Sequence, residues 1–594
     1  MIYFPPLRRL LLPATIFLTV IVFYRSSFGV PSSLPSFVLH PPPPPAEGIR
    51  IPVIDFQSVP LPANATENHV PPASQFFYDL YPGSNRSSSP PTPSKPIDNP
   101  ALQILWQCPV QVNRYTNHVR IAAIVRNITQ TPADPLKPEN RVFWNPTIIS
   151  LPYWAENQYL VVSRIVTDGN HQENVICEAN ICYVGSEEDA KAGEKPCTDD
   201  DLKLLGPAGG LRCASAPISL NVPPTPAELC HGKYLPFVDV PGFHDPRIFW
   251  SGKGEPLMMV NTQSRYACFG LWMIDLRSLH PSLQNLLASS PRHPSLGPLK
   301  SYPTLTELTR NPPSTRSSIE KNWLPFFPSS GESYIHYDLS NPINTSMRGR
   351  TFAKLLGNGF TTTNLTDPLE LPCLIEDDSK ETDPVKKGGT WHQATNSLRL
   401  ILCNRTDPQC KDTNENTVFF AIIHRKFPNY LDLPLRYERY FMVWSSTPPF
   451  SLLGISKHPI LMANETASGW TESENWSDDP LNVETVEKFK KQHHAVNHLG
   501  QNGTHNVSST DTSSMEPFGG KAYWAYFTYT VSIAYAWGRG NSEEVGDKNV
   551  GYLDDEVVLA IGIDDKGQGF ARAKAADLVQ CLRACPGSAV DGSG

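Results

Sequence analysis

The sequence has few charged residues, little helical periodicity and no long apolar run. Charged residues make up 18% of its 594 residues, whereas it holds 59 prolines, 12 tryptophans and 21 tyrosines. This composition is typical of a loop-rich protein built from strands rather than helices. The net charge of -8 lacks the basic excess that nucleic-acid binding requires, so we expect no nucleic-acid partner.

The most apolar segment near the amino terminus covers residues 10–24 and is flanked by arginines. About 15 residues are short for a membrane span, although arginine side chains at both ends can reach the interface. A cleaved signal peptide has the same outline, but the small-residue cleavage signal that follows is poor. We therefore expect a cytosolic tail at 1–9 and an uncleaved transmembrane signal-anchor at 10–25, in the single-pass type II orientation.

Residues 26–100 are rich in proline and serine and include five consecutive prolines at 41–45. Such a segment lacks the apolar periodicity of a core and is expected to be an extended or disordered stem. Tail, anchor, stem and a lumenal body at 101–594 form the layout of a Golgi-type resident. The predicted location is therefore the membrane of the Golgi or of another secretory-pathway compartment.

Sequons and cysteines agree with a lumenal body. Asn-X-Ser/Thr sequons predict surface glycans; they lie at Asn64, Asn85, Asn127, Asn344, Asn364, Asn404, Asn464, Asn475, Asn502 and Asn506. The even number of 12 cysteines fits disulfide bonds in an oxidising lumen.

Three cysteine pairs are close enough in sequence to be local loop staples, although spacing does not fix connectivity. The pairs are Cys177/Cys182, Cys403/Cys410 and Cys581/Cys585. Metal binding is the alternative for such pairs, but no CxxC motif in the sequence is accompanied by a matching second half of a metal-binding site.

The body consists of successive strand-like segments. Apolar or alternating runs of strand length occur at residues 118–126, 141–151, 158–166 and 266–276, with glycine, proline or asparagine between them. Residues 166–230 have the composition of a cysteine-rich loop, and residues 280–316 that of a polar, proline-rich insertion. We expect such insertions on the rim of a β scaffold.

The stretch Phe243–Val260, FHDPRIFWSGKGEPLMMV, predicts two short strands joined by a glycine turn. Pro246 fits the first residue of a strand, and it is expected to hold Asp245 in an extended conformation just outside. The charged pair Asp245 and Arg247 at a strand mouth indicates a functional site. An Asp-Pro turn beside a surface arginine is the alternative.

The same plan recurs along the chain. Residues 320–342 place Lys321 and Asn322 before an apolar strand, a glycine turn and a partner strand, and similar units follow at 388–426, 437–456 and 523–565. A polar, sequon-rich insertion occupies 464–520. Repetition of this kind predicts radially arranged sheets, and hence an all-β, five-bladed β-propeller with rim insertions and with polar residues of several blades converging on one face.

These units carry a resemblance to a known group of enzymes. HDPRIFW, EKNWLPF with YIHYDLSNP, KGGTWHQATNSLRLILC, FFAIIHRK, YERYFMVWSSTPPFSLLGIS and LDDEVVLAIGIDD occur in the order in which five-bladed propeller enzymes acting on glycans carry similar units. Over about residues 240–565 the chain resembles fungal β-mannosyltransferases and the related mannoside phosphorylases and mannosyltransferase/phosphorylases.

The resemblance implies a glycosyltransferase that transfers mannose from a nucleotide sugar, GDP-mannose, to a glycan acceptor. It implies no further cofactor and no metal. Because no catalytic-acid motif matches position by position, two alternatives stay open. One is a glycosidase or glycoside phosphorylase acting on mannosides, and the other is a non-catalytic carbohydrate-binding propeller.

Sugar transfer needs carboxylates that accept or donate a proton and that stabilise the positive charge developing on the sugar in the transition state. Asp245 is the first catalytic candidate, as general acid/base or as the acceptor of sugar hydroxyls. Arg247 and Lys321 suit a phosphate or diphosphate, the arginine as a fork and the lysine as a point charge. Asn322, together with His336 and His424, is expected to orient hydroxyls, although both histidines also suit a core.

A second candidate is the acidic cluster of Asp554, Asp555 and Glu556. Mutual repulsion there can raise one pKa, so we expect Asp555 and Glu556 to be catalytic and Asp554 to bind substrate. Asp554 with Asp555, like Asp199 to Asp201, also resembles an acidic metal-binding pair, and solvated turns are the simpler interpretation of both.

Aromatic residues can stack on a sugar face. Trp323 and Trp391 lie near the predicted strand mouths and are the candidates for this role. The aromatic run Tyr523 to Trp537 fits a core better than a sugar platform.

Overall fold

The computed structural model describes most of the predicted body. The described residues are 99–109, 112, 118–130, 143–166, 172–186, 191, 193–220, 225, 228–239, 242–289, 300–339, 350–366, 371–374, 390–427, 436–465, 528–538, 549–563 and 567–585. The predicted anchor at 10–25 and all but the last residues of the predicted stem at 26–100 lie outside this set.

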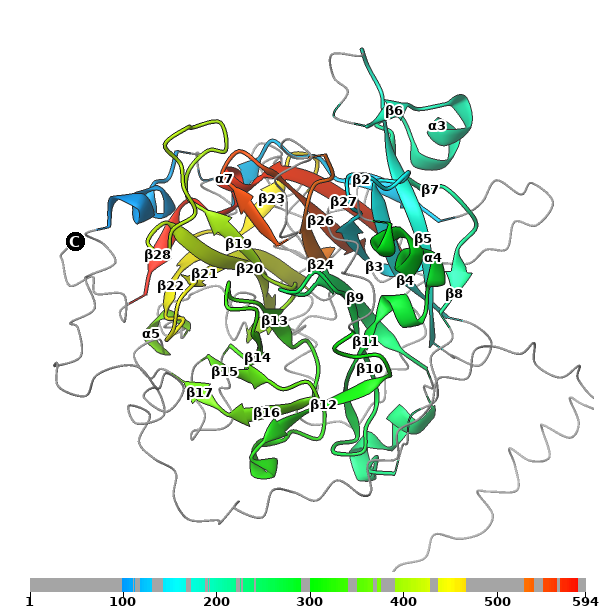
Figure 1. The fold of residues 1–594 in the computed structure, drawn as a ribbon, viewed down its shortest axis with the longest axis vertical. Helices are drawn as coiled ribbons and strands as arrows, with labels where there is room; N and C mark the ends of the chain where they lie inside the picture. Colours follow the sequence, from blue (N-terminus) through cyan, green and yellow to red (C-terminus); the bar gives the residue numbers. More distant parts are fainter. Residues whose placement is uncertain are drawn as a thin grey trace, which may run out of the picture. The chain divides into compact units, whose positions relative to one another are not determined.

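Strands dominate the described residues, so the predicted all-β class is confirmed (Figure 1). The helices formed by the described residues are short. The α-helices among them are α3 (Asp199–Leu205), α4 (Pro281–Ala288), α5 (Leu371–Leu374) and α7 (Ala575–Leu578), and the 3-10 helices are η4 (Pro100–Trp106), η7 (Gly232–Asp239), η8 (Leu276–Ser278) and η10 (Pro313–Thr315). No helix in the described ranges is long and apolar enough to cross a bilayer.

The first two runs of strands are antiparallel, except that the short strand β6 pairs with β5 in parallel. We call such a run a unit and number the units in chain order. Unit 1 contains β3 (Phe143–Ser150), β4 (Tyr159–Val166), β5 (Gln172–Tyr183) and β7 (Gly210–Cys213), with β6 (Lys195–Pro196) and β8 (Ile218–Ser219) beside β5. Unit 2 contains β9 (His244–Trp250), β10 (Pro256–Gln263), β11 (Phe269–Asp275) and β12 (Thr306–Asn311).

Three further units complete the body. Unit 3 contains β13 (Leu324–Phe326), β14 (Ser333–Asp338), β15 (Thr351–Leu355) and β16 (Phe360–Thr363), with β17 (Leu365–Thr366) beside β15. Unit 4 contains β18 (Thr390–Gln393) and β19 (Leu398–Ile401), which both pair with β20 (Thr417–Phe427), followed by β21 (Arg436–Ser445), β22 (Leu452–Ser456) and β28 (Leu582–Ala584). Unit 5 contains β24 (Thr528–Tyr535), β26 (Glu556–Ile563), β27 (Gly567–Lys574) and β2 (Arg126–Thr129).

The first strands of units 2, 3 and 5 lie innermost. In Figure 1, β24, β9 and β13 lie near the middle of the view, while β7, β12, β16 and β28 lie towards its outside. Outer strands link neighbouring units, because β12 pairs with β16 and β2 pairs with β7, both in parallel. Between units, apolar faces pack on one another, as Phe326 of unit 3 does on Phe419 of unit 4.

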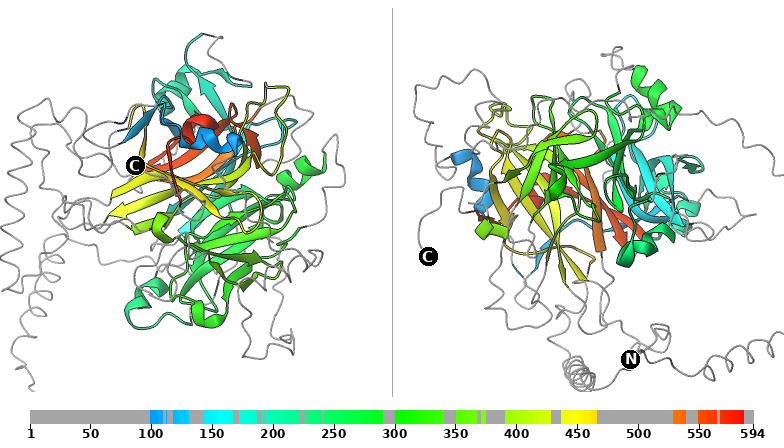
Figure 2. Two further views of the ribbon diagram at one scale, coloured as in Figure 1. Left: turned by 90° about the vertical axis from the view of Figure 1, so that its left-hand side faces the viewer. Right: turned by 90° about the horizontal axis from the view of Figure 1, so that it is seen from below.

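The chain closes on itself through its ends. β2 is the outer strand of unit 5 although it precedes unit 1 in the sequence, and β1 (Val119–Ile121) pairs with β23 (Ile460–Met462). The remaining short strand, β25 (Val550–Tyr552), pairs with β19. A disulfide joins Cys108 to Cys581, so η4 lies beside β28 (Figures 1 and 2).

All twelve cysteines form disulfides, but only one of the three expected local pairs is right. Cys403 pairs with Cys410, as predicted. The other bonds are Cys108–Cys581, Cys177–Cys213, Cys182–Cys197, Cys230–Cys268 and Cys373–Cys585. The other two predictions were wrong because the folding of the strands brings together cysteines that lie far apart in the sequence. Sequence spacing does not show which cysteines come close enough to form a bond.

The predicted loop at 166–230 is also wrong. It contains β5, a strand of 12 residues that is largely buried, in which Cys177 packs in the same core cluster as Ala179 and Ile181. In the predicted insertion at 280–316, α4 and β12 are formed. Polar and cysteine-rich composition hid these elements.

Four of the ten sequons lie in described residues. Asn127, Asn404 and Asn464 are exposed, whereas Asn364 is half-buried. Asn464 already bonds Val125 through both side-chain atoms. The other six, Asn64, Asn85, Asn344, Asn475, Asn502 and Asn506, lie outside the described residues.

We expect the Cys108–Cys581 disulfide to stabilise the fold more than Cys403–Cys410 does. The first joins residues 473 positions apart and the second residues 7 apart, and a longer closed loop restricts the unfolded chain more. Replacing Cys108 and Cys581 by serine should lower the free energy of unfolding by about 2–5 kcal/mol. Thermal unfolding of both double-serine variants measures this, and an equal loss of Tm in the two would contradict it.

Candidate active site

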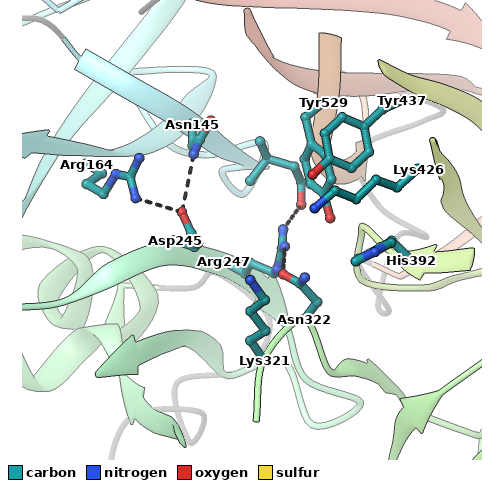
Figure 3. A pocket seen from close by; sticks show the side chains of 11 residues that line it. Asn145, Arg164, Asp245, Arg247, Lys321, Asn322, His392, Lys426, Tyr437 and Tyr529 are labelled. Carbon is teal, nitrogen blue, oxygen red and sulfur yellow. Dashed lines mark hydrogen bonds and ion pairs between the residues drawn. The ribbon is translucent and has the colours of Figure 1, made fainter. Parts of the chain in front are cut away.

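A cavity of about 210 Å³ lies among the inner strands, and Figure 3 shows the side chains around it. Every unit contributes to its lining, as the repeat pattern predicts. The lining residues are Asn145 and Arg164 of unit 1, Asp245 and Arg247 of unit 2, Lys321 and Asn322 just before β13, His392, Lys426 and Tyr437 of unit 4, and Tyr529 and Val531 of unit 5.

Three lining residues near the start of an inner strand of successive units adopt a left-handed backbone. The φ angle is 48° at Asn145, 47° at Asp245 and 59° at Asn322. Asn and Asp tolerate this region better than most residues do, yet it still costs about 1–3 kcal/mol. The expectation that Asp245 is extended is therefore wrong, because its positive φ interrupts the extended backbone within β9.

Bulges in the inner strands accompany these turns. The register of β3 with β4 leaves Asn145 and Pro146 opposite one residue, and that of β9 with β10 does the same for Asp245 and Pro246. In β24, Val531 is left without a partner in β26. A bulge bends its strand and re-aims side chains or carbonyls. Strands β3, β9 and β24 thus direct polar groups into the cavity.

Asp245 is held by two neighbours from unit 1. Its Oδ1 accepts hydrogen bonds from Asn145 Nδ2 at 3.2 Å and from Arg164 Nη1 at 3.0 Å. Burial raises the pKa of Asp245, but the charges of Arg164, Arg247, His244 and Lys321 together bring this pKa below its usual value. The carboxylate is therefore ionised at neutral pH and is ready to accept a proton or a hydroxyl hydrogen bond.

Arg247 connects three units. It is 4% exposed, and it donates from Nη1 to the carbonyl oxygen of Val531 at 2.8 Å and from Nη2 to Asn322 Oδ1 at 3.0 Å. Its guanidinium also faces the ring of Tyr529 at 5.9 Å. Arg247 thus fixes the cavity wall as well as adding charge to it.

Two lysines face the cavity from the other side. No acidic side chain in the described residues forms an ion pair with Lys321 or Lys426, and burial followed by repulsion from Lys321 lowers the pKa of Lys426. His392 lies beside them, and burial, then Lys426 and Lys321, lower its pKa to about 4. His392 is therefore neutral at neutral pH, and the unmatched positive charge marks a place for an anion.

His336 and His424 are fully buried and do not line the cavity. His336 Nε2 bonds Arg350 Nη1 at 3.0 Å, and its ring packs on Phe326 and Trp444. His424 Nε2 accepts from the backbone N–H of Thr530 at 3.3 Å. Burial lowers the pKa of both histidines well below the usual value. Neither side chain is placed to orient a sugar hydroxyl directly.

The predicted stacking tryptophans are core residues. Trp323 is 1% exposed, donates to Glu320 and packs edge-on against Tyr337. Trp391 is buried and donates to the carbonyl oxygen of Leu374. Neither presents a face to the cavity.

The acidic cluster lies away from the cavity. Tyr529, which lines the cavity, pairs with Gly562 of β26. Glu556 lies six residues from Gly562 along the same strand, which is about 20 Å at the rise per residue of a β-strand. Asp554 and Asp555 are bound by Arg405, and Glu556 is bound by Arg572 and Lys191. Charge pairing, not repulsion, governs this cluster, since Arg572 and Lys191 outweigh burial and lower the pKa of Glu556. The catalytic assignment of Asp555 and Glu556 and the substrate-binding assignment of Asp554 are not supported by this geometry.

The second acidic run, Asp199 to Asp201, begins helix α3. Thr198 and Asp201 form a capping box, and Asp201 pairs with Arg212. Within the described ranges, no group of three or more His, Cys, Asp or Glu side chains is arranged to hold a metal ion.

Sequence reasoning found Asp245, Arg247, Lys321 and Asn322 but missed the rest of the lining. Asn145 carried a signal, because FWNP at 143–146 repeats the Asx-Pro of FHDP at 243–246. Tyr529 was expected in a core, and Arg164, His392, Lys426, Tyr437 and Val531 carry no local motif. Their roles follow from the sheet arrangement alone.

No family model matches the chain, and no curated protein matches its sequence. Solved structures similar to it include MPT-4, a mannose phosphorylase from Leishmania mexicana in complex with phosphate ion, at 7% identity, with 79% of this chain and 92% of that chain covered and a TM-score of 0.31. A β-1,2-mannobiose phosphorylase from Listeria innocua has 9% identity, 75% and 94% coverage and a TM-score of 0.33.

MPT-1, a GDP-Man-dependent mannosyltransferase from Leishmania mexicana, has 8% identity, 77% and 91% coverage and a TM-score of 0.29. Identities and scores this low assign no activity to the chain.

Because several histidines are buried, we expect the folded protein to become less stable as the pH falls. Burial lowers the pKa of His280, His336, His392 and His424, so between about pH 6.5 and these folded pKa values the unfolded chain binds protons that the folded protein does not. Stability should thus fall as the pH drops from 7 towards 4, by at most about 1.4 kcal/mol per pH unit for each histidine.

Tm measured from pH 7.5 to 4.5 tests this expectation, with His392→Gln as the variant that should show a shallower slope. A Tm that stays level or rises over this range would contradict it.

Proposed function

We propose that the chain is a carbohydrate-active enzyme, a glycosyltransferase that moves mannose from a nucleotide sugar to a hydroxyl of a glycan acceptor. We further propose that units 1 to 5 are the five blades of a β-propeller whose central cavity is the active site. The donor most consistent with the motif resemblance is GDP-mannose.

The proposal rests on the charges in the cavity lining, where one carboxylate faces four cationic side chains. Among the eleven described residues that line the cavity, Asp245 is the one acid, against Arg164, Arg247, Lys321 and Lys426. Hydrolysis of a glycoside by the usual routes needs two carboxyl groups, about 5–9.5 Å apart. Transfer from a phosphate-linked sugar needs one proton acceptor and positive charge at the leaving group, which this lining supplies.

The proposed step is an inverting displacement at the anomeric carbon. The bond from this carbon to the donor phosphate oxygen breaks, its electron pair stays on that oxygen, and the acceptor hydroxyl oxygen forms the new bond while its proton passes to Asp245. Lys321 and Lys426 stabilise the departing phosphate as point charges. Arg164 and Asn145 hold Asp245, and Asn322 is placed to bond a sugar hydroxyl.

A mannoside phosphorylase is the second candidate, and the size of the cavity favours it. About 210 Å³ is less than the roughly 300–1,000 Å³ of pockets that enclose drug-sized ligands, so one sugar ring and one phosphate fit, while a nucleotide would extend beyond the lysines. Inorganic phosphate held by Lys321 and Lys426 would then attack the anomeric carbon as the bond from this carbon to the glycosidic oxygen breaks. The ionised Asp245 would take the proton of the incoming hydrogen phosphate and pass it to the leaving oxygen.

The six disulfides support an oxidising compartment, and a Golgi or other secretory-pathway membrane remains our proposal for the location. The membrane anchor at 10–25 is part of that proposal. Glycan acceptor, nucleotide sugar and membrane are its expected partners.

The activity can be tested with the full-length protein in detergent, given a panel of nucleotide sugars with mannose-containing acceptors, and mannosides with phosphate. We expect transfer from GDP-mannose, unchanged by EDTA, and a fall of at least about 10²-fold in Asp245→Asn because the proton acceptor is lost. Cleavage of mannosides only with phosphate would establish the phosphorylase instead. Binding of sugars without turnover of any substrate would leave a non-catalytic propeller.

The lysines are expected to act on the phosphate group. Lys321→Gln and Lys426→Gln should each raise KM for the phosphate-bearing substrate about tenfold, equivalent to about 1.4 kcal/mol, and should reduce the dependence of KM on salt. Lys203→Gln is the matched control, since Lys203 is exposed on α3 and pairs with Asp200. An unchanged KM in both cavity variants would remove the phosphate site from the proposal.

A further inference from the structure

Arg439 of β21 uses every N–H of its guanidinium. Nε donates to Thr530 Oγ1 at 2.7 Å, and Nη2 donates to Glu465 Oε1 at 3.1 Å and to Thr528 Oγ1 at 3.4 Å. Nη1 donates to Glu465 Oε2 at 2.8 Å and to the carbonyl oxygen of Ile460 at 3.2 Å. An arginine has five such donors, so all of them are bound.

The partners of Arg439 come from two separate stretches of chain. Glu465 follows β23, and Thr528 and Thr530 belong to β24, the inner strand of unit 5. Side chains of Arg439 and Glu465 are 3% and 6% exposed. Burial raises the pKa of Glu465, but Arg439 outweighs it and lowers this pKa, which keeps the carboxylate ionised. Arg439 therefore joins unit 4 to the segment after β23 through a buried ion pair with Glu465. It joins unit 4 to β24 through hydrogen bonds to the hydroxyls of Thr528 and Thr530.

A row of side chains leads from Arg439 to the cavity. In the register of unit 4, His392 lies opposite His424, and His424 lies opposite Arg439, so all three share one face of the sheet. His392 lines the cavity. His424 accepts the backbone N–H of Thr530, and its ring lies 4.4 Å from that of Tyr529. Thr530 is thus held at its side chain by Arg439 and at its backbone by His424.

Thr530 lies between two lining residues. Tyr529 and Val531 border the cavity, whereas the fully buried Thr530 points the other way, towards Arg439. Val531 is the bulged residue of β24, and its carbonyl oxygen accepts from Arg247, which in turn bonds Asn322. A shift of Thr530 would move this carbonyl and with it Arg247 and Asn322.

We propose that Arg439 is a positioning residue, which acts through Thr530 and the Val531 carbonyl to orient Arg247 and Asn322 in the cavity. This role rests on the proposed glycosyl transfer. The cost of removing two charges from water offsets their attraction, so a buried ion pair adds little to stability. The presence of such a pair here fits a role in holding Arg439 in one orientation. A displacement of 1 Å can cost an enzyme a large factor in rate.

Thr530→Val tests the role most selectively, because it removes one acceptor of Arg439 and leaves the Arg439–Glu465 pair in place. Thr361→Val is the matched control: Thr361 is 2% exposed, accepts from Asn311 N at 3.2 Å, and lies in β16 on the outside of unit 3. The measurements are kcat and KM in the assay to which wild type responds, Tm, and binding of sulfate as a phosphate probe.

We expect Thr530→Val to lower kcat about tenfold, with KM, sulfate affinity and Tm close to those of Thr361→Val, because the lysines that bind the anion are untouched. Arg439→Lys, which keeps the charge and loses the fork, should lower kcat further.

The outcomes separate the two proposals. Wild type that turns over no sugar substrate overturns the proposed function and the positioning role with it. An active wild type with an unchanged kcat in Thr530→Val, or with kcat falling only in step with Tm, overturns the positioning role alone.

Discussion

Pairing between the two ends of the body is the constraint on which the site depends. β2 completes unit 5 by pairing with β27, and it also pairs with β7 of unit 1, so the first and last units are held side by side. Without that closure, Asn145 and Arg164 from unit 1 would not face Tyr529 and Val531 from unit 5. A wall made from both ends of a chain forms only when the whole body is folded, which ties the integrity of the cavity to global stability.

The cavity gathers features that oppose folding. Like charges lie together, three residues adopt a left-handed backbone, and bulges interrupt three inner strands. Each of these costs free energy, and the surrounding sheets offset it through apolar packing between units. Such a concentration at one end of otherwise regular strands is how catalytic sites differ from the scaffold that carries them.

The sequence allowed the all-β class and the key strand mouth to be predicted, because apolar alternation and Asx-Pro turns are local signals. The segments around Asp245 and around Lys321 share one pattern of polar residues before an apolar strand. This repeat predicted that Asp245 and Arg247 lie near Lys321 and Asn322. It misplaced Asp555 and Glu556, since a dense acidic run gives no sign of the arginines that come from distant strands to neutralise it.

His392, Lys426 and Tyr437 could not be found for a related reason. Which face of β18, β20 and β21 meets the cavity is set by their register and by the neighbouring unit 5. Thr530 of unit 5, for example, bonds His424 from 106 positions further along the chain. Trp323 and Trp391 were misjudged because nearness to a strand mouth does not show which way a side chain points.

The left-handed residues of units 1, 2 and 3, Asn145, Asp245 and Asn322, all lie near the start of an inner strand and line the cavity. Two of these positions hold an amide and one holds an acid, and the two side chains are nearly identical in size. The difference between a cavity with one carboxylate and a cavity with two is therefore a single amide-to-acid exchange at a position already shaped for it. In a repeated architecture of this kind, one substitution can change the number of carboxylates in the cavity and requires no change in fold.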